Sequence, residues 1–161
     1  MLPMTSKKTI FLIRHAKTES PLPGMDDFDR VLKKRGENDA AEISTRLVAR
    51  GVKPDLILSS PAKRAKKTAE IFAAALKPEK GILFIPELYL PHPSVFDAIL
   101  SKLDSSITSV AIVSHNNGIT EYANSLGIVR IDNMPTASVL GYEDGIERKF
   151  LFFEFPNKKN D

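Results

Sequence analysis

The sequence predicts an α/β fold: a three-layer α/β/α sandwich with a mostly parallel, doubly wound sheet and an antiparallel edge near the C-terminus. Two observations carry this prediction. Short apolar runs alternate with segments of helical periodicity along most of the chain, which is typical of parallel sheets covered on both faces. Near the C-terminus, two strand-like segments flank a turn signal, which favours an antiparallel pair at the sheet edge.

Four short runs rich in apolar and β-branched residues are the predicted parallel strands. They occupy residues 9–13, 56–58, 83–85 and 109–113. This composition is expected of strands that are buried on both faces. The antiparallel pair is predicted at 137–142 and 147–155, on either side of Asp144-Gly145.

Segments with apolar residues at spacings of three and four predict the helices. They are expected at 37–50, from Pro61 to about residue 76, at 93–103 and at 119–126. Ser60 is expected to cap the second helix, with Pro61 at its first position. Residues 17–35 hold several Pro, Gly and Asp residues and are expected to form a loop. We predict one domain, 1–161, with loose tails at 1–6 and 157–161.

The composition excludes several classes of protein. Of the 161 residues, 42% are hydrophobic and 27% charged, which is normal for a folded domain. Cysteine is absent, so a disulfide framework, a thiolate nucleophile and a cysteine-ligated zinc site are excluded. The net charge is +3, but basic residues are dispersed and Trp is absent, so no nucleic-acid partner is expected. No apolar run approaches the ~20 residues that span a bilayer; we expect no membrane association and a cytoplasmic location.

Notable polar residues follow three of the four predicted parallel strands. Arg14-His15 follows the first strand, and Ser59-Ser60-Pro61 follows the second and leads to Arg64. Ser114-His115-Asn116 follows the fourth. Because the carboxyl ends of parallel strands lie along one rim, where ligands bind in open α/β sheets, these side chains are expected to share one crevice.

This combination of residue types indicates a phosphate site. Arginine presents a planar fork of donors that matches phosphate oxygens, and helix N-termini after Ser60 and His115 would favour an anion. A histidine can attack phosphorus as a nucleophile, and cationic surroundings would keep its imidazole neutral. We therefore predict His15 as the nucleophile, with catalysis resting on positioning and on charge stabilisation.

Each residue also has an ordinary structural explanation. His15 alone is equally compatible with a core histidine, and His115 with a polar strand end. Arg64 alone, in the basic run 63–67, is better explained by a solvated helix face. Their joint occurrence at three strand ends favours the functional interpretation. His92 is interpreted as a cap or surface residue, and the aspartates at 26, 27 and 29 as a solvated loop rather than a metal site.

The motifs resemble those of a known family. The run Leu12-Ile13-Arg14-His15-Ala16 resembles the Arg-His-Gly signature of the histidine phosphatase superfamily, which has the phosphoglycerate mutase-like fold. Further blocks, in the order found in that family, resemble its short branch near the SixA-type phosphohistidine phosphatases. They lie at 26–36, 54–70, 113–116 and 134–137.

The resemblance implies particular roles. His15 would carry a transient phosphoryl group, and Arg14, Arg64 and His115 would hold its oxygens, with a donor near Asn116. No metal or organic cofactor is expected. The sequence departs from the family pattern at Ala16, Val31, Ser114 and Asn117, none of which is a charged catalytic position.

The proton donor is not evident, because this short chain lacks the insertion that supplies a glutamate in many larger members. Glu87, near the end of the third predicted strand, is the best candidate, with a loop carboxylate as the equal alternative. Glu19 is a weaker candidate. Whether Lys17 and Glu19 touch substrate is left open.

Three functions remain open from the sequence. The leading one is a phosphatase for phosphohistidine or another phosphoprotein, whose partner would be a phosphorylated protein. A phosphomonoesterase for a small phosphorylated metabolite is the second, and an inactive phosphate-binding or interaction module is the third. A mutase is less favoured, since it requires additional loops that enclose the substrate.

Overall fold

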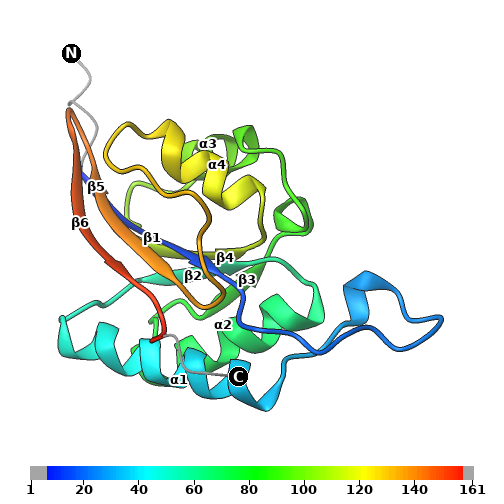
Figure 1. Cartoon of the computed structure of the whole chain (residues 1–161). Coiled ribbons are helices and arrows are strands. Elements are labelled where there is room, and N and C mark those ends of the chain that lie inside the picture. The colour runs from blue at the N-terminus through cyan, green and yellow to red at the C-terminus, as the bar shows by residue number, and fades with distance from the viewer. Residues whose placement is uncertain (1–6, 158–161) are drawn as a thin grey trace.

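A computed structural model of the chain describes residues 7–157, so the tails expected at 1–6 and 157–161 lie outside the described residues, except for residue 157. The described part contains a six-stranded sheet with helices on both faces (Figure 1). Its strands are β1 Lys8–Arg14, β2 Leu56–Ser59, β3 Ile82–Phe84, β4 Ser109–Ser114, β5 Val139–Asp144 and β6 Arg148–Glu154. No helix among the described residues is long and apolar enough to cross a membrane.

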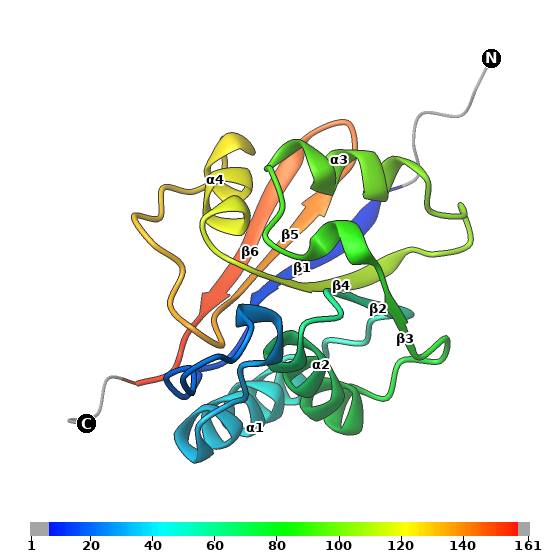
Figure 2. The same ribbon diagram turned by 90° about the vertical axis from the view of Figure 1, so that its right-hand side faces the viewer.

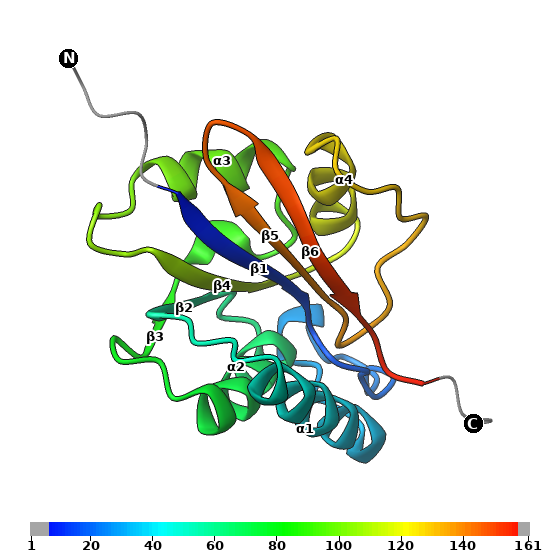
Figure 3. The same cartoon turned by 90° about the vertical axis from the view of Figure 1, so that its left-hand side faces the viewer.

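The strand order is β3-β2-β4-β1-β5-β6. Strands β1 to β4 pair in parallel, whereas β5 pairs antiparallel with both β1 and β6. Figure 3 shows the hairpin of β5 and β6 at the edge of the sheet. The predicted fold class, including the antiparallel C-terminal edge, is confirmed.

Two helices cover each face of the sheet (Figures 1 and 2). Helices α1 (Lys34–Ala49) and α2 (Lys63–Leu76) lie on one face, and α3 (Ser94–Ser101) and α4 (Gly118–Ser125) on the other. Two short 3-10 turns, at Asp27–Asp29 and Pro86–Leu88, interrupt the connecting segments.

The apolar run of β1 is buried on both faces, which explains its lack of polar alternation. Ile10 and Leu12 belong to the core under α3 and α4, while Phe11 and Ile13 belong to the core over α1 and α2. Successive side chains of a strand point to opposite faces, so a central strand between two helix layers must be apolar at every position.

The second helix begins later than predicted, and its expected cap is wrong. The helix starts at Lys63 with Ala62 as the preceding cap residue. Ser60 Oγ instead accepts a hydrogen bond from the Ala62 N–H at 3.2 Å and lies 2.8 Å from Nε2 of His115. Ser60 therefore does not cap α2 and instead contacts His115 at the carboxyl ends of the strands.

Other boundaries shift by a few residues. Helix α1 begins at Lys34 rather than residue 37, and it ends before Gly51, which adopts a φ of 80°. The segment predicted as a loop from residue 17 is partly ordered by an isolated bridge between Thr18 and Leu32.

Candidate active site

A cavity of about 390 Å³ opens at the carboxyl ends of the strands. Three predicted strand ends contribute to it, and so does the connecting segment 17–33. The lining side chains are Arg14, His15, Lys17, Thr18, Asp27, Arg30, Arg64, Leu90, His115, Asn116 and Thr136. The structure thus brings five of the six predicted site residues to one place.

His15 is held in a single tautomer by the backbone. Its Nδ1 atom lies 2.8 Å from the carbonyl oxygen of Ala16, and only a protonated nitrogen can donate to a carbonyl. The proton is therefore on Nδ1, and Nε2 carries a free lone pair. Burial, together with the smaller effect of the charges of Arg64 and Arg14, lowers the pKa of His15 to about 4, although the bond to Ala16 opposes the shift. At neutral pH the imidazole is uncharged.

The backbone around His15 is fixed from two sides. The Ala137 N–H donates to the carbonyl oxygens of both Arg14 and His15, each at 3.1 Å. The Ala16 N–H donates to Thr68 Oγ1 at 3.0 Å, and the Thr68 hydroxyl donates to the Arg64 carbonyl at 2.7 Å. The nucleophile and Arg64 are thus connected through α2.

Arg64 is almost completely buried, with 3% of its surface exposed. It donates from one terminal nitrogen to the Asp27 carbonyl at 2.7 Å and from the other to Asp27 Oδ2 at 2.8 Å. The Tyr89 hydroxyl donates to the same Oδ2 at 2.6 Å. The Tyr89 hydrogen bond, followed by those of Arg64 and Arg30, lowers the pKa of Asp27 to about 2 despite the opposing effect of desolvation. Asp27 is therefore ionised and positions Arg64.

Two further arginines line the cavity. Arg14 donates to the Met134 carbonyl at 2.7 Å, and Arg30 donates to Thr18 Oγ1 at 2.6 Å. The Nε atoms of both arginines are buried without a hydrogen-bond partner among the described residues. A buried N–H group without a partner is costly, and an anion in the cavity is one way to satisfy it.

His115 lies beside His15, with 5.1 Å between the ring centroids. Its Nε2 contacts Ser60 Oγ, while its buried Nδ1 has no partner among residues 7–157. Burial lowers the pKa of His115 to about 3, with the neighbouring His15 and Arg64 adding to the shift. The ring is thus neutral. The side chain of Asn116, which lines the cavity, donates to Asn133 Oδ1 and accepts from the Thr120 hydroxyl.

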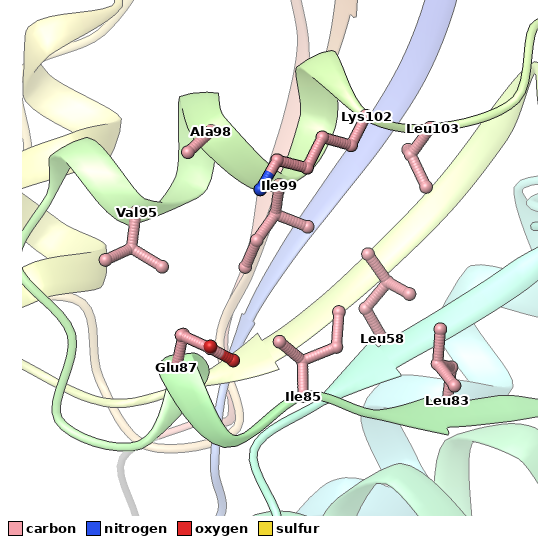
Figure 4. A pocket seen from close by; sticks show the side chains of 9 residues that line it. All are labelled: Leu58, Leu83, Ile85, Glu87, Val95, Ala98, Ile99, Lys102 and Leu103. Atoms are coloured by element: carbon pink, nitrogen blue, oxygen red, sulfur yellow. The ribbon is translucent and has the colours of Figure 1, made fainter.

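The structure does not bring Glu87 to this cavity. Glu87 lies on the turn after β3 and lines a separate, mainly apolar pocket of about 350 Å³ beneath α3 (Figure 4). The expectation that it protonates the leaving group is therefore wrong on geometric grounds. Glu19 is exposed and is also absent from the cavity lining, whereas Lys17 is present. His92 accepts the Ser94 N–H at the start of α3, as expected of a cap.

Sequence reasoning missed Asp27 and Tyr89. Asp27 was interpreted as part of a solvated loop, but it contacts Arg64, Arg30 and Tyr89. No local pattern marks these residues, since the contacts join segments that are 37 and 62 positions apart. Within the described chain, no group of three or more His, Asp or Glu residues is placed to hold a metal ion.

The fold and the cluster around His15 define a class of protein. The sequence model of the histidine phosphatase superfamily (branch 1) matches residues 10–87. Over these residues the chain is similar to the histidine phosphatase superfamily, and its structure is similar to those of SixA-type members.

Individual relatives agree with this assignment. The crystal structure of the putative phosphohistidine phosphatase SixA from Agrobacterium tumefaciens matches with a TM-score of 0.82 and 26% identity, covering 92% of this chain and 99% of that one. The protein histidine phosphatase SixA complexed with tungstate matches with a TM-score of 0.75 and 19% identity, covering 88% and 96%. That second match shows the fold alone.

An uncharacterized chloroplastic protein of Arabidopsis thaliana is 33% identical over 134 residues, which is 77% of this chain. The aligned region covers 62% of that relative, so the chain corresponds to less than two thirds of its length.

Proposed function

We propose that the chain is a phosphatase that acts through a phosphohistidine intermediate at His15, with phosphohistidine or another phosphorylated protein as substrate. The observation that carries this proposal is the free Nε2 lone pair of a buried, neutral His15 in a cavity that also contains Arg14, Arg64 and His115. A neutral imidazole is the nucleophilic form, and two guanidinium groups suit the charge of a transferring phosphoryl group.

The proposed reaction has two balanced steps. Nε2 of His15 attacks phosphorus, and the bond between phosphorus and the leaving nitrogen or oxygen breaks. Water then attacks the phosphorylated His15, the P–Nε2 bond breaks, and inorganic phosphate leaves with His15 restored. Arg14, Arg64 and His115 would hold the phosphoryl oxygens in both steps, and the unpartnered Nε of Arg14 and Nδ1 of His115 support this role.

The acid–base properties of the cavity favour a phosphoramidate leaving group. Among the described residues, Asp27 carries the one carboxyl group that lines the cavity. Its pKa of about 2 makes it a poor proton donor at neutral pH. An alkyl alcohol leaves poorly unless it is protonated. The imidazole of phosphohistidine, protonated on its other nitrogen, leaves as a neutral ring and needs no enzyme acid.

The alternative is a small phosphorylated metabolite. A cavity of about 390 Å³ is within the range of small-molecule sites, which supports this alternative on volume. A comparison of turnover between a histidine-phosphorylated protein and common sugar phosphates ranks the two. Absence of turnover with every phosphodonor would favour a phosphate-binding module instead.

A trapping experiment tests the nucleophile. The protein is incubated with radiolabelled phosphoramidate and quenched, and we expect acid-labile, base-stable label on the wild type and none on His15→Ala. His92→Ala is the matched control, because His92 is exposed and lies outside the cavity. Full turnover by His15→Ala would overturn the proposal.

A further inference from the structure

Leu90 has an unusual backbone conformation for a leucine at the edge of the His15 cavity. Its φ is +46°, in the left-handed region that side chains other than glycine rarely adopt. It also precedes Pro91, and a residue in that position normally prefers an extended backbone. The side chain is 54% exposed, so its own burial contributes little to offset the strain.

Neighbouring contacts hold this conformation on both sides. Before it, the Tyr89 hydroxyl is bonded to Asp27. After it, Pro91 is buried against Gly118 so closely that a Cβ at 118 would lie 2.1 Å from the Pro91 carbonyl oxygen. The strain at Leu90 is therefore imposed by the fold, and strained residues of this kind cluster at functional sites.

Leu90 is part of an apolar wall beside the phosphate cavity, formed by Leu90, Tyr89 and Phe28. Leu90 itself lines the cavity. The Tyr89 ring lies edge-on to His115, with centroids 5.4 Å apart, and edge-on to Phe28, with centroids 5.1 Å apart. Phe28 is 37% exposed, so the wall continues from the cavity onto the surface.

This wall differs chemically from the cavity beside it, which is lined by Arg14, Arg30 and Arg64. A sugar phosphate would place hydroxyl groups against carbon, where they find no hydrogen-bond partner and lose hydration. A protein segment can place an apolar side chain there while its phosphorylated residue enters the cavity. Leu90 itself lines the cavity, so both contacts can form together.

We propose that Leu90 is a specificity-determining residue that contacts an apolar side chain next to the phosphorylated residue of a protein substrate. This inference rests on the proposed function for its substrate class. It goes further because it names the residue that contacts the sequence next to the phosphorylated residue. It also requires an apolar side chain at that place in the substrate.

Peptide binding tests the proposal without turnover. Two fluorescent peptides carry a stable phosphoryl-triazole analogue of phosphohistidine, one flanked by leucines and the other by serines. We expect the wild type to bind the leucine-flanked peptide about fivefold or more tightly, from the burial of one or two apolar groups. Leu90→Gly should abolish this preference.

Two variants separate specificity from folding. Leu83 on β3 is 53% exposed and does not line the cavity, so Leu83→Ala is the matched control and should keep the preference. Leu90→Gly removes the strain as well as the side chain, and we expect its Tm to rise by about 2–4 °C. A loss of preference in a more stable protein cannot be ascribed to unfolding.

Three results would overturn the proposal: equal binding of both peptides by the wild type, a preserved preference in Leu90→Gly, or an equal loss in Leu83→Ala. The trapping experiment on His15 is independent of these measurements. A preference for the leucine-flanked peptide without any label on His15 would refute the proposed phosphatase activity. It would still support the proposed contact between Leu90 and an apolar side chain of the peptide.

Discussion

Nδ1 of His15 donates a hydrogen bond to the carbonyl oxygen of Ala16 over 2.8 Å, so the adjacent residue determines which ring nitrogen is free. A backbone carbonyl cannot change its protonation state and is therefore a constant acceptor. The bond favours a protonated Nδ1 and directs the lone pair of Nε2 away from the backbone. Such fixation of a histidine tautomer is a general way to prepare one nitrogen for chemistry.

Burial of His15 predicts a loss of stability in mild acid. Its pKa is about 4 in the folded chain and about 6.5 in the unfolded chain, so the unfolded state binds more protons between these values. Stability is therefore present above pH 6.5 and falls as the pH drops toward 4, by about 2 kcal/mol between pH 7 and 5 for this residue. Urea denaturation of wild type and His15→Asn measures the effect.

His15→Asn should show a correspondingly smaller loss of stability between pH 7 and 5. The interval from pH 7 to 9 is the internal control, since the imidazole is largely neutral in both states there. Identical pH dependence of the two proteins from pH 7 to 5 would contradict the assignment of a buried neutral histidine.

Arg64→Lys should lower kcat/KM about 10- to 100-fold. The guanidinium bonds to both the carbonyl and Oδ2 of Asp27, and a lysine ammonium cannot reproduce this planar arrangement and still face the phosphoryl group. Steady-state kinetics with phosphoramidate measure the loss. Lys63→Ala, one residue earlier and exposed, is the control that should retain activity. Equal activity of Arg64→Lys and wild type would show that Arg64 is only structural.

Tyr89→Phe should raise the pKa of Asp27 from about 2. The hydrogen bond from the Tyr89 hydroxyl is the largest cause of the low pKa, so its removal destabilises the ionised carboxylate relative to the protonated one. Titration of ¹³C-labelled aspartate carboxyl groups by NMR detects the change. Tyr122→Phe is the matched control, because that hydroxyl donates to Asp97 instead. An unshifted Asp27 midpoint in Tyr89→Phe would refute this account.

Gly118→Ala should destabilise the protein by about 2 kcal/mol or more, because the added Cβ would overlap the Pro91 carbonyl oxygen at 2.1 Å. Thermal unfolding monitored by circular dichroism measures the loss. Gly145→Ala is the control, since its Cβ would meet Lys7 at an ordinary 3.7 Å. Similar Tm values for the two variants would mean that Pro91 and α4 are not tightly packed.

Several elements of the fold were predictable because their causes are local. Strand β1 is an uninterrupted apolar run, and the hairpin after β5 contains Asp144-Gly145, so chain composition and turn chemistry sufficed. The start of α2 was not predictable in this way. Ser60 has the residue type of a helix cap, but a neighbour 55 positions away, His115, draws its hydroxyl into another contact. The tertiary hydrogen bond to His115 therefore outweighed the local preference of Ser60 for a helix cap.

The residues of the candidate site also differ in whether local sequence could place them. His15, Arg14, Arg64 and His115 could be gathered from the sequence because parallel strands place their carboxyl ends together. Glu87 also follows a strand, yet the turn Pro86–Leu88 directs it under α3 instead. A strand end specifies the rim of the sheet but not the face on which the next residues continue.

The sequence by itself determined the fold class, the resemblance to a superfamily and the residues that meet at the sheet rim, because periodicity, strand ends and motif order are encoded along the chain. Only the tertiary structure decided that Asp27 holds Arg64, that Glu87 lies elsewhere and that Leu90 is strained beside the cavity. These features depend on contacts between segments that are distant in sequence, and on burial, which sets whether a histidine or a carboxylate is charged.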